Sequence, residues 1–285
     1  MPFGAWRERM IGGLLGGQDR DGGFGGHPYA KWGGAHWRLV SLVELGIPAG
    51  HRDALRAADN VLSWIAAPSP PRLVAGRERR HASMEGNALL ACCGLGLTGD
   101  ERVRGLVATL LRAQWPDGGW NCDVRPQATH SSFHETVTPI RGLAAYAAAA
   151  GDAEASSAAR RGAELLLQHR LFRRTSDGEP IQAEMLNIHW PAYWHCDFFI
   201  GLRAVDEAGL AGDPRAGDAL DCLRALESPG GTWRATGRRY WRRPGSGASG
   251  CEAVDWGDAA PIVTSIARAL LGIARGTRAE LASSV

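Results

Sequence analysis

The fold is decided by the stretch Gln114-Trp115-Pro116-Asp117-Gly118-Gly119-Trp120-Asn121-Cys122-Asp123, which ends an apolar run, turns on two glycines and leads into a cysteine- and histidine-rich segment. Its spacing, Gln-x3-Gly-x-aromatic, occurs first over Gln18–Phe24. It occurs a third time, with Glu in place of Gln, over Glu227–Trp233. A leucine stands four residues before the Gln or Glu of each copy. A helix end that recurs in this way along a chain indicates a repeat protein.

The composition is that of an ordinary globular protein: of 285 residues, 45% are hydrophobic and 22% are charged. A repeat architecture allows the whole chain, residues 1–285, to form a single domain. The formal net charge of +2 argues against bulk nucleic-acid binding, so no nucleic-acid partner is expected. No apolar stretch reaches the length of a transmembrane helix, and the N-terminus has no apolar signal core. Six cysteines without framework spacing then predict reduced thiols in a cytoplasmic protein.

Hydrophobic periodicity predicts ten helices in which amphipathic and apolar segments alternate, with almost no strand signal. The ends of the amphipathic helices recur roughly every 50 residues, which suits a helix pair plus a loop. An all-α fold of five helix pairs is therefore expected, with an inner ring of apolar helices and an outer ring of amphipathic helices. The predicted amphipathic helices are 3–16, 52–66, 101–114, 153–172 and 214–226, and the predicted apolar helices are 35–46, 82–97, 131–150, 192–209 and 259–274.

The fuller pattern Arg104-Gly105-x3-Thr109-Leu110-x3-Gln114-x3-Gly118-x-Trp120 resembles the QW motif of squalene and hopene cyclases and of the protein prenyltransferase β subunits. The resemblance spans essentially the whole chain and implies an α/α toroid, in which paired helices close around an apolar cavity. It also implies an enzyme that acts on a hydrophobic, isoprenoid-like small molecule. The protonating Asp-x-Asp-Asp motif of the class II cyclases is absent, so cyclisation started by that motif is not expected.

Side chains that can bind a metal or take part in catalysis gather at the starts of the apolar helices, which would place them around one mouth of the cavity. The sharpest subset is Cys122, His130, His134 and His195, because cysteine and histidine are the preferred ligands of zinc. His130 and His134 are four residues apart, so they would share a helix face if both lie on the helix. The segment Tyr193–Leu202 resembles the helix start that carries the zinc-binding histidine of the prenyltransferases. A zinc site is therefore expected, and the alternative is that these histidines are caps and hydrogen-bonding partners.

The remaining candidates are assigned by residue type. Glu135, Tyr193, Asp197 and Asp255 are predicted to carry acid–base catalysis, and for the carboxylates the alternative is helix capping. Arginines of the Gly230–Gly250 segment are predicted to bind an anion such as a diphosphate, with a solvated basic loop as the alternative. The predicted substrate-binding residues are Trp37, His81, Glu85, Trp120, Asp123, Trp194 and Trp256, and the predicted anion-binding residues are Arg238, Arg239 and Arg242.

Three other functions stay open at this point. One is a zinc-dependent hydrolase. Another is a thiol-activating enzyme similar to the lanthionine cyclases, which are also zinc-binding α/α toroids, although their cysteine and histidine pairs are not reproduced in this sequence. The third is a non-catalytic toroid that binds a hydrophobic ligand or a partner protein. Zinc content distinguishes the enzymes from the binding module.

Overall fold

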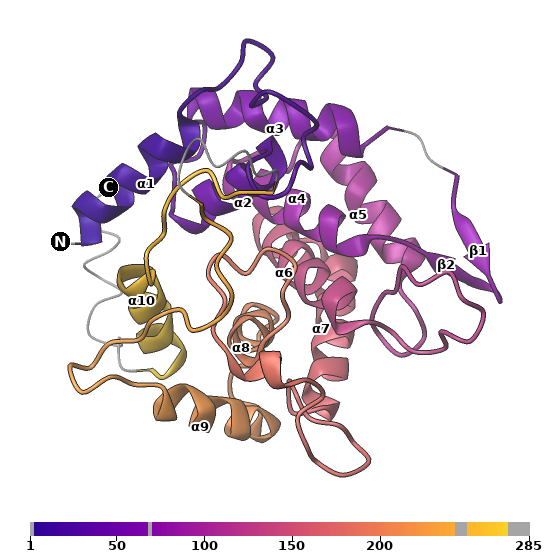
Figure 1. Cartoon of the computed structure of the whole chain (residues 1–285). Coiled ribbons are helices and arrows are strands. Elements are labelled where there is room, and N and C mark those ends of the chain that lie inside the picture. The colour runs from indigo at the N-terminus through magenta and orange to yellow at the C-terminus, as the bar shows by residue number, and fades with distance from the viewer. Residues whose placement is uncertain (1–2, 68–69, 243–249, 273–285) are drawn as a thin grey trace.

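The computed structural model describes residues 3–67, 70–242 and 250–272, and these residues are mainly helical (Figure 1). Each of the ten predicted helices is present, which confirms the all-α part of the prediction. The α-helices are α1 (Phe3–Leu15), α2 (Ala35–Glu44), α3 (Arg52–Ile65), α4 (Ala82–Gly94), α5 (Glu101–Ala113), α6 (Phe133–Ala150), α7 (Ala153–Gln168), α8 (Phe198–Glu207), α9 (Gly217–Ala225) and α10 (Ala260–Leu270). Residues 273–274 of the last predicted helix lie outside the described residues. None of the described helices is both long enough and apolar enough to cross a bilayer.

The helices pack in a regular order. Helices α2, α4, α6, α8 and α10 contact one another in sequence, and α1 contacts both α2 and α10. Helices α3, α5, α7 and α9 lie towards the outside of the molecule (Figure 1). The pair α4 and α6 is almost entirely buried, as expected for helices that are apolar on every side.

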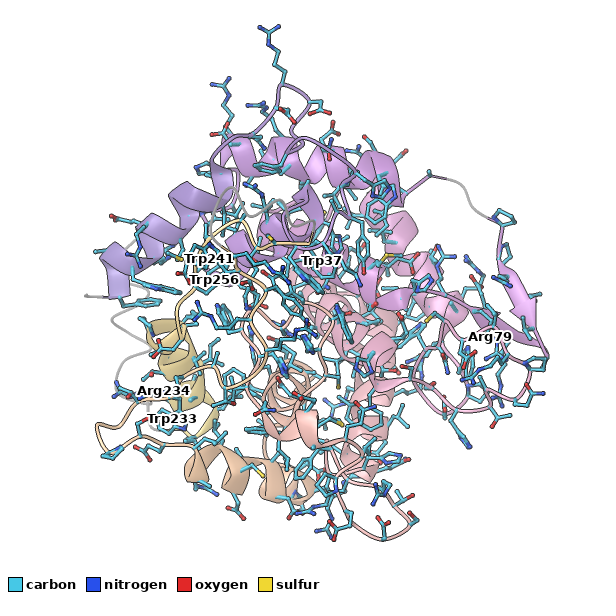
Figure 2. All side chains as sticks on the ribbon, viewed as in Figure 1. Trp37, Arg79, Trp233, Arg234, Trp241 and Trp256 are labelled. Carbon is cyan, nitrogen blue, oxygen red and sulfur yellow. The ribbon has the colours of Figure 1, made fainter. Side chains whose placement is uncertain are left out.

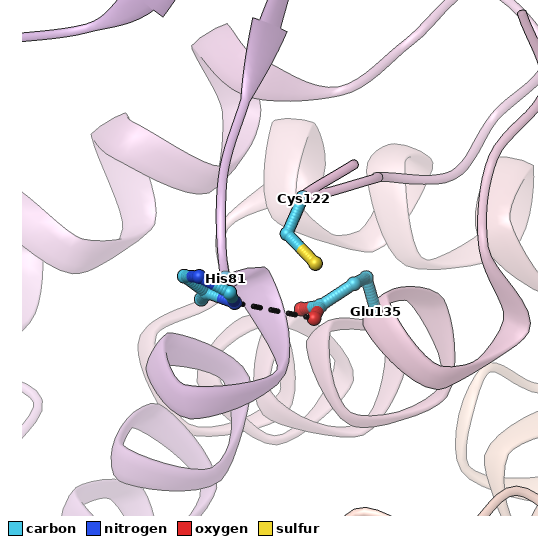
Figure 3. Close-up of side chains that lie close together, drawn as sticks. All are labelled: His81, Cys122 and Glu135. Atoms are coloured by element: carbon cyan, nitrogen blue, oxygen red, sulfur yellow. Dashed lines mark ion pairs between the residues drawn. The ribbon is translucent and has the colours of Figure 1, made fainter. Parts of the chain in front are cut away.

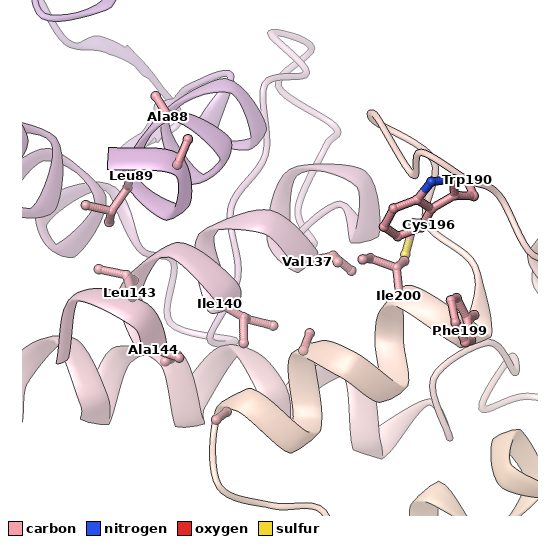
Figure 4. Packing of buried hydrophobic residues seen from close by; sticks show 14 of the residues in the cluster. Ala88, Leu89, Val137, Ile140, Leu143, Ala144, Trp190, Cys196, Phe199 and Ile200 are labelled. Atoms are coloured by element: carbon pink, nitrogen blue, oxygen red, sulfur yellow. The ribbon is translucent and has the colours of Figure 1, made fainter. Parts of the chain in front are cut away.

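Glycines allow α4 and α6 to approach closely. A Cβ atom at Gly86 would lie 2.3 Å from the backbone nitrogen of Pro139, and one at Gly142 would lie 2.5 Å from the carbonyl oxygen of Gly86. Leu89 of α4 and Ile140 of α6 pack beside this crossing, and apolar side chains continue the core towards α8 (Figure 4). The core therefore runs through the even-numbered helices, as the alternation of apolar and amphipathic segments predicts.

The repeated motif ties successive outer helices together. The Nε2 atom of Gln114 donates to the carbonyl oxygens of Gly118 at 2.7 Å and of Ala158, in α7, at 2.9 Å. In the first copy, the Nε2 atom of Gln18 donates to Gly22 at 3.2 Å and to Asp53, in α3, at 2.9 Å. Equivalent residues thus make equivalent bonds, each between the loop after one outer helix and the next outer helix.

The aromatic residue of the motif is also structural. The indole N–H of Trp120 donates to the carbonyl of Leu110 at 2.9 Å, and that of Trp233 donates to Leu223 at 2.7 Å. Both rings are fully buried in the core, and Trp233 is labelled in Figure 2. Trp120 thus has a structural role, because its ring is packed in the core and its N–H closes the preceding helix, and its assignment as a substrate-binding residue stays a prediction.

One element was not predicted. Strands β1 (Arg72–Val74) and β2 (Arg77–Arg79) form an antiparallel hairpin that projects from the helical body (Figure 1). Its two-residue turn, Ala75-Gly76, has positive φ at both positions, as a type I′ turn requires. Alanine is not the usual first residue of such a turn, so the sequence signal is weak. The hairpin matters because it leads directly into His81.

Candidate metal centre and the neighbouring aromatic cluster

Three side chains with metal-binding atoms converge at one place. One ligand atom from each of His81, Cys122 and Glu135 lies within 4.8 Å of the others (Figure 3). His81 immediately precedes α4, Cys122 lies in the loop between α5 and α6, and Glu135 lies in the first turn of α6. Among the side chains that the structure describes, this trio, called here the metal group, is the one set of three or more that meets this distance criterion.

The backbone explains why these residues meet. The amide of Arg80 donates to the carbonyl of Asn121 at 2.9 Å, which places the next residues along the chain, His81 and Cys122, side by side. Glu135 reaches across from α6, and its Oε2 atom accepts a 2.8 Å hydrogen bond from the amide of Ser83 in the first turn of α4. Its Oε1 atom lies 3.6 Å from Nδ1 of His81. The carboxylate therefore joins the starts of α4 and α6.

The metal group has one buried side and one open side. The side chain of Glu135 is 9% exposed, whereas that of His81 is 65% exposed. The pKa of His81 is raised to about 10, because its ring forms hydrogen bonds with Cys122, which has the larger effect, and with Glu135. Burial alone would raise the pKa of Glu135, but hydrogen bonds from His81 and the Ser83 amide lower it. Glu135 is thus an anion at neutral pH and protonated His81 is its counterion, so a metal ion bound here would have to displace the proton of His81.

Of the four predicted ligands, Cys122 alone belongs to the metal group. His130 is exposed and lies before α6, because Asp117 binds the amide and hydroxyl of Ser131, at 2.8 and 2.6 Å, and holds this segment in a turn. His130 and His134 therefore do not share a helix face, and that step of the prediction is wrong. The ring of His134 lies 5.5 Å from that of Trp194.

His195 is also elsewhere. It precedes α8, which starts at Phe198, later than predicted, and its Nε2 atom lies 2.7 Å from the hydroxyl of Tyr240. Burial is the largest cause that lowers the pKa of His195 to about 3, so its ring is neutral at physiological pH. The other two members of the metal group are His81 and Glu135. The sequence places both at the correct helix starts, but it predicts His81 as a substrate-binding residue and Glu135 as a catalytic residue.

The structure also contains an aromatic cluster. Trp32, Trp37 and Tyr193 are buried together, with ring centroids of Trp32 at 5.0 Å from Trp37 and 4.6 Å from Tyr193. Trp37 is labelled in Figure 2. Three half-buried rings complete the cluster: Tyr29, Trp194 and Tyr240. Burial is the largest cause that raises the pKa of Tyr29 to about 12, and the charges of Glu135 and Cys122 act in the same direction.

Both predicted catalytic aspartates accept hydrogen bonds from backbone amides. Asp197 is fully buried, and its Oδ1 atom accepts from the amide of Ile200 at 2.8 Å. Its Oδ2 atom accepts from both the amide and Nδ1 of His189 at 2.9 Å. Asp255 is exposed, forms an ion pair with Arg239 and accepts from the amide of Gly257 at 3.0 Å. The contacts of Asp197 agree with the capping interpretation, whereas Asp255 precedes α10 by five residues and holds a local turn instead of capping the helix.

The other predicted residues are dispersed. Asp123 is held by Arg125 and Glu85 by Arg80, in ion pairs with closest N–O distances of 2.5 Å. Trp194 stacks on His195 with centroids 4.6 Å apart, whereas Trp256 packs on Trp6 at 6.1 Å. The arginines of the loop separate as well. Arg238 lies over the ring of Tyr240, Arg239 pairs with Asp255, and Arg242 is exposed.

Sequence reasoning missed a buried acid beside the aromatic cluster. Glu252 is 8% exposed, and burial raises its pKa to about 7, although a hydrogen bond from Tyr193 acts in the opposite direction. It follows Cys251 at the end of the glycine- and arginine-rich segment, where no periodicity indicates burial. Glu252 adds a titratable group to the aromatic cluster.

The chain was compared with known proteins at the level of families, sequences and structures. No protein-family model, no curated protein and no solved structure matches it significantly.

Proposed function

We propose that this chain is an α/α toroid enzyme that binds zinc through His81, Cys122 and Glu135 and acts on an apolar, isoprenoid-like small molecule held against the aromatic cluster. The observation that carries the proposal is the convergence of a nitrogen, a sulfur and an oxygen ligand atom within 4.8 Å of one another. The circle of helix contacts from α1 through α2, α4, α6, α8 and α10 back to α1 supports the toroid.

The donor set fits zinc. Bonds of about 2.0–2.3 Å to a tetrahedral zinc ion separate neighbouring ligand atoms by about 3.3–3.8 Å. The distance of 3.6 Å between His81 Nδ1 and Glu135 Oε1 lies in this range, and the ligand atoms of all three residues, the sulfur of Cys122 included, lie within 4.8 Å of one another. A mixed nitrogen, sulfur and oxygen set favours zinc over magnesium or calcium, which prefer oxygen ligands alone. The Ser83 amide orients Glu135, as partners of metal ligands commonly do.

Three protein ligands leave one coordination position for a reactant, which is the pattern of catalytic rather than structural zinc sites. Bound zinc lowers the pKa of a coordinated water or thiol and polarises a carbonyl oxygen. The exposed side of His81 leaves that position open to solvent. Trp194 of the aromatic cluster lies 5.5 Å from the ring of His134, the residue before Glu135, so the proposal places the apolar part of the substrate on this cluster and its reactive end at the open position.

A cysteine nucleophile is the second candidate. It is favoured by the hydrogen bond between His81 and Cys122, because a protonated imidazole next to a cysteine stabilises the reactive thiolate. Alkylation by iodoacetamide distinguishes the two functions. A zinc ligand is protected until a chelator is added, whereas a free nucleophile reacts at the same rate with and without chelator.

Elemental analysis of the purified chain tests the zinc site. We expect stoichiometric zinc in the wild-type protein and almost none in Cys122→Ser, His81→Ala or Glu135→Gln. His130→Ala and His195→Ala are matched controls, since both remove a histidine that lies outside the metal group, and both should keep their zinc. A wild-type protein that stays metal-free after incubation with zinc would refute the site. Loss of zinc in the two controls would instead restore the ligand set predicted from sequence.

A further inference from the structure

His36 is a buried histidine whose hydrogen-bonding capacity is unused. It lies in the first turn of α2, its exposed fraction is 0%, and neither of its ring nitrogens has a hydrogen-bond partner. Within the described ranges, each of the other buried side chains that has an unpartnered polar atom has only one, and His36 alone has two. Buried polar groups are nearly always paired because an unpaired group destabilises the fold. Two orphaned nitrogens on one ring therefore point to a partner supplied by another molecule.

Three aromatic rings surround this imidazole. The ring of Trp37 lies edge-on at 4.9 Å, that of Tyr29 lies at 5.4 Å, and that of Trp64 lies edge-on at 6.0 Å. The backbone is fixed, since the amide of His36 donates to the carbonyl of Pro28 at 3.0 Å. Burial lowers the pKa of His36 to about 3, so the ring is neutral at physiological pH and offers one donor and one acceptor.

Two of the three rings separate His36 from solvent. Tyr29 and Trp64 are half-buried, whereas Trp37 is 1% exposed and forms the floor. Trp64 lies in the last turn of α3, where its outer contact is the exposed ring of His27 at 5.1 Å. A ligand would therefore have to pass Tyr29 or Trp64 to reach His36.

We infer that His36 is the polar anchor of a ligand subsite, walled by Tyr29, Trp37 and Trp64, that takes an uncharged hydroxyl or carbonyl group carried on an apolar or aromatic molecule. The aromatic walls favour an apolar body. A neutral imidazole pairs with a group that donates or accepts one hydrogen bond and gives no counterion to a charged one. The role of this ligand as substrate rests on the proposed function, but its binding requires no metal.

A matched pair of probes tests the subsite. 4-Fluorophenol and 4-fluorotoluene have nearly the same size, and the first alone carries a hydroxyl, so ¹⁹F NMR titrations isolate the contribution of His36. We expect the wild-type protein to bind the phenol about tenfold more tightly. His36→Leu should abolish that preference. It should also raise the melting temperature by about 2–5 °C, since the orphaned nitrogens are removed.

His51→Leu is the control variant. His51 also has an unpartnered ring nitrogen, but it lies at the start of α3, about 20 Å along the helix from Trp64. This variant should keep the preference for the phenol. A second measurement uses the wild-type protein alone, where a ring ¹⁵N resonance of His36 should shift with the phenol and not with the toluene.

The inference is overturned if wild type binds both probes equally, if His36→Leu retains the preference, or if the ¹⁵N resonances of His36 do not respond. A lower melting temperature of His36→Leu would overturn it as well, because it would show that the nitrogens have partners in the fold. The titrations are repeated on zinc-free Cys122→Ser protein. A preference that survives there supports the subsite even if the zinc site fails, so the two proposals fail separately.

Discussion

Replacement of Arg141 by methionine perturbs a buried ion network that joins three helices. Arg141, in α6, donates from Nε and Nη2 to Glu207 of α8 at 2.7 and 2.8 Å, and from Nη1 to Glu44 of α2 at 2.6 Å. Arg203 of α8 donates to the other oxygen of Glu44 at 2.5 Å. The side chain of Arg141 is 5% exposed, so methionine fills its volume but leaves two carboxylates with fewer partners.

The structure sets the size of the stability loss expected for Arg141→Met. Removal of one partner from a buried ion pair costs about 3–5 kcal/mol. Glu44 keeps Arg203, and Glu207 is 31% exposed and can be hydrated, so the lower end applies. We expect the free energy of unfolding to fall by about 3 kcal/mol at pH 7. The expected decrease in melting temperature is about 6–12 °C. Arg174→Met is the control, because its pair with Asp177 is exposed and should contribute far less to stability.

The pH dependence gives the stricter test. Burial raises the pKa of Glu44, but Arg141 and Arg203 together lower it to about 2, below the ordinary value of 4.5. A carboxylate with a lowered pKa stabilises the fold above its unfolded pKa, and that stability is lost as pH falls towards the folded value. The gap between wild type and Arg141→Met should therefore shrink from pH 5 to pH 2. Urea unfolding, followed by circular dichroism, measures this difference in unfolding free energy. A difference below about 1 kcal/mol at pH 7, or one that does not change with pH, would refute this reasoning.

Three further predictions use the same assays. Gln114→Ala should lower the free energy of unfolding by about 2 kcal/mol, because two carbonyls lose their donor. Gly118→Ala should cost about 3 kcal/mol or more, since φ is +97° and the new Cβ would lie 2.4 Å from the carbonyl oxygen of Arg161. Gly151→Ala, with positive φ but open space, should cost about 1 kcal/mol, and equal losses would contradict this account. Saturating zinc should raise the melting temperature of wild type by about 5–10 °C and leave Cys122→Ser unchanged.

The helices were predictable because their signals are local. Apolar spacing and capping residues act within a few positions, as at Asp100, whose side chain accepts from the amide of Arg102, and at Asp152, which accepts from Ala155. The starts of α6 and α8 were misplaced for reasons that are not local. Asp117 of the preceding repeat holds Ser131 in a turn, and Tyr193 adopts a positive φ of 50° before Asp197 caps α8.

In the candidate site, too, local signals were predictable from sequence and non-local contacts were not. Periodicity brings His81 and Glu135 to the starts of neighbouring inner helices, so their proximity followed from the repeat. The choice of ligands rested instead on the four-residue spacing of His130 and His134, which is informative only if both residues are helical. What selects the metal group is the backbone bond from Arg80 to Asn121, and that bond depends on a hairpin with an atypical turn. Since the three ligands come from a hairpin end, a loop and a helix, zinc bound there would also fasten these elements to one another. The chelated protein should then exchange amide hydrogens faster in residues 72–80 and 121–132 than in α4 and α6.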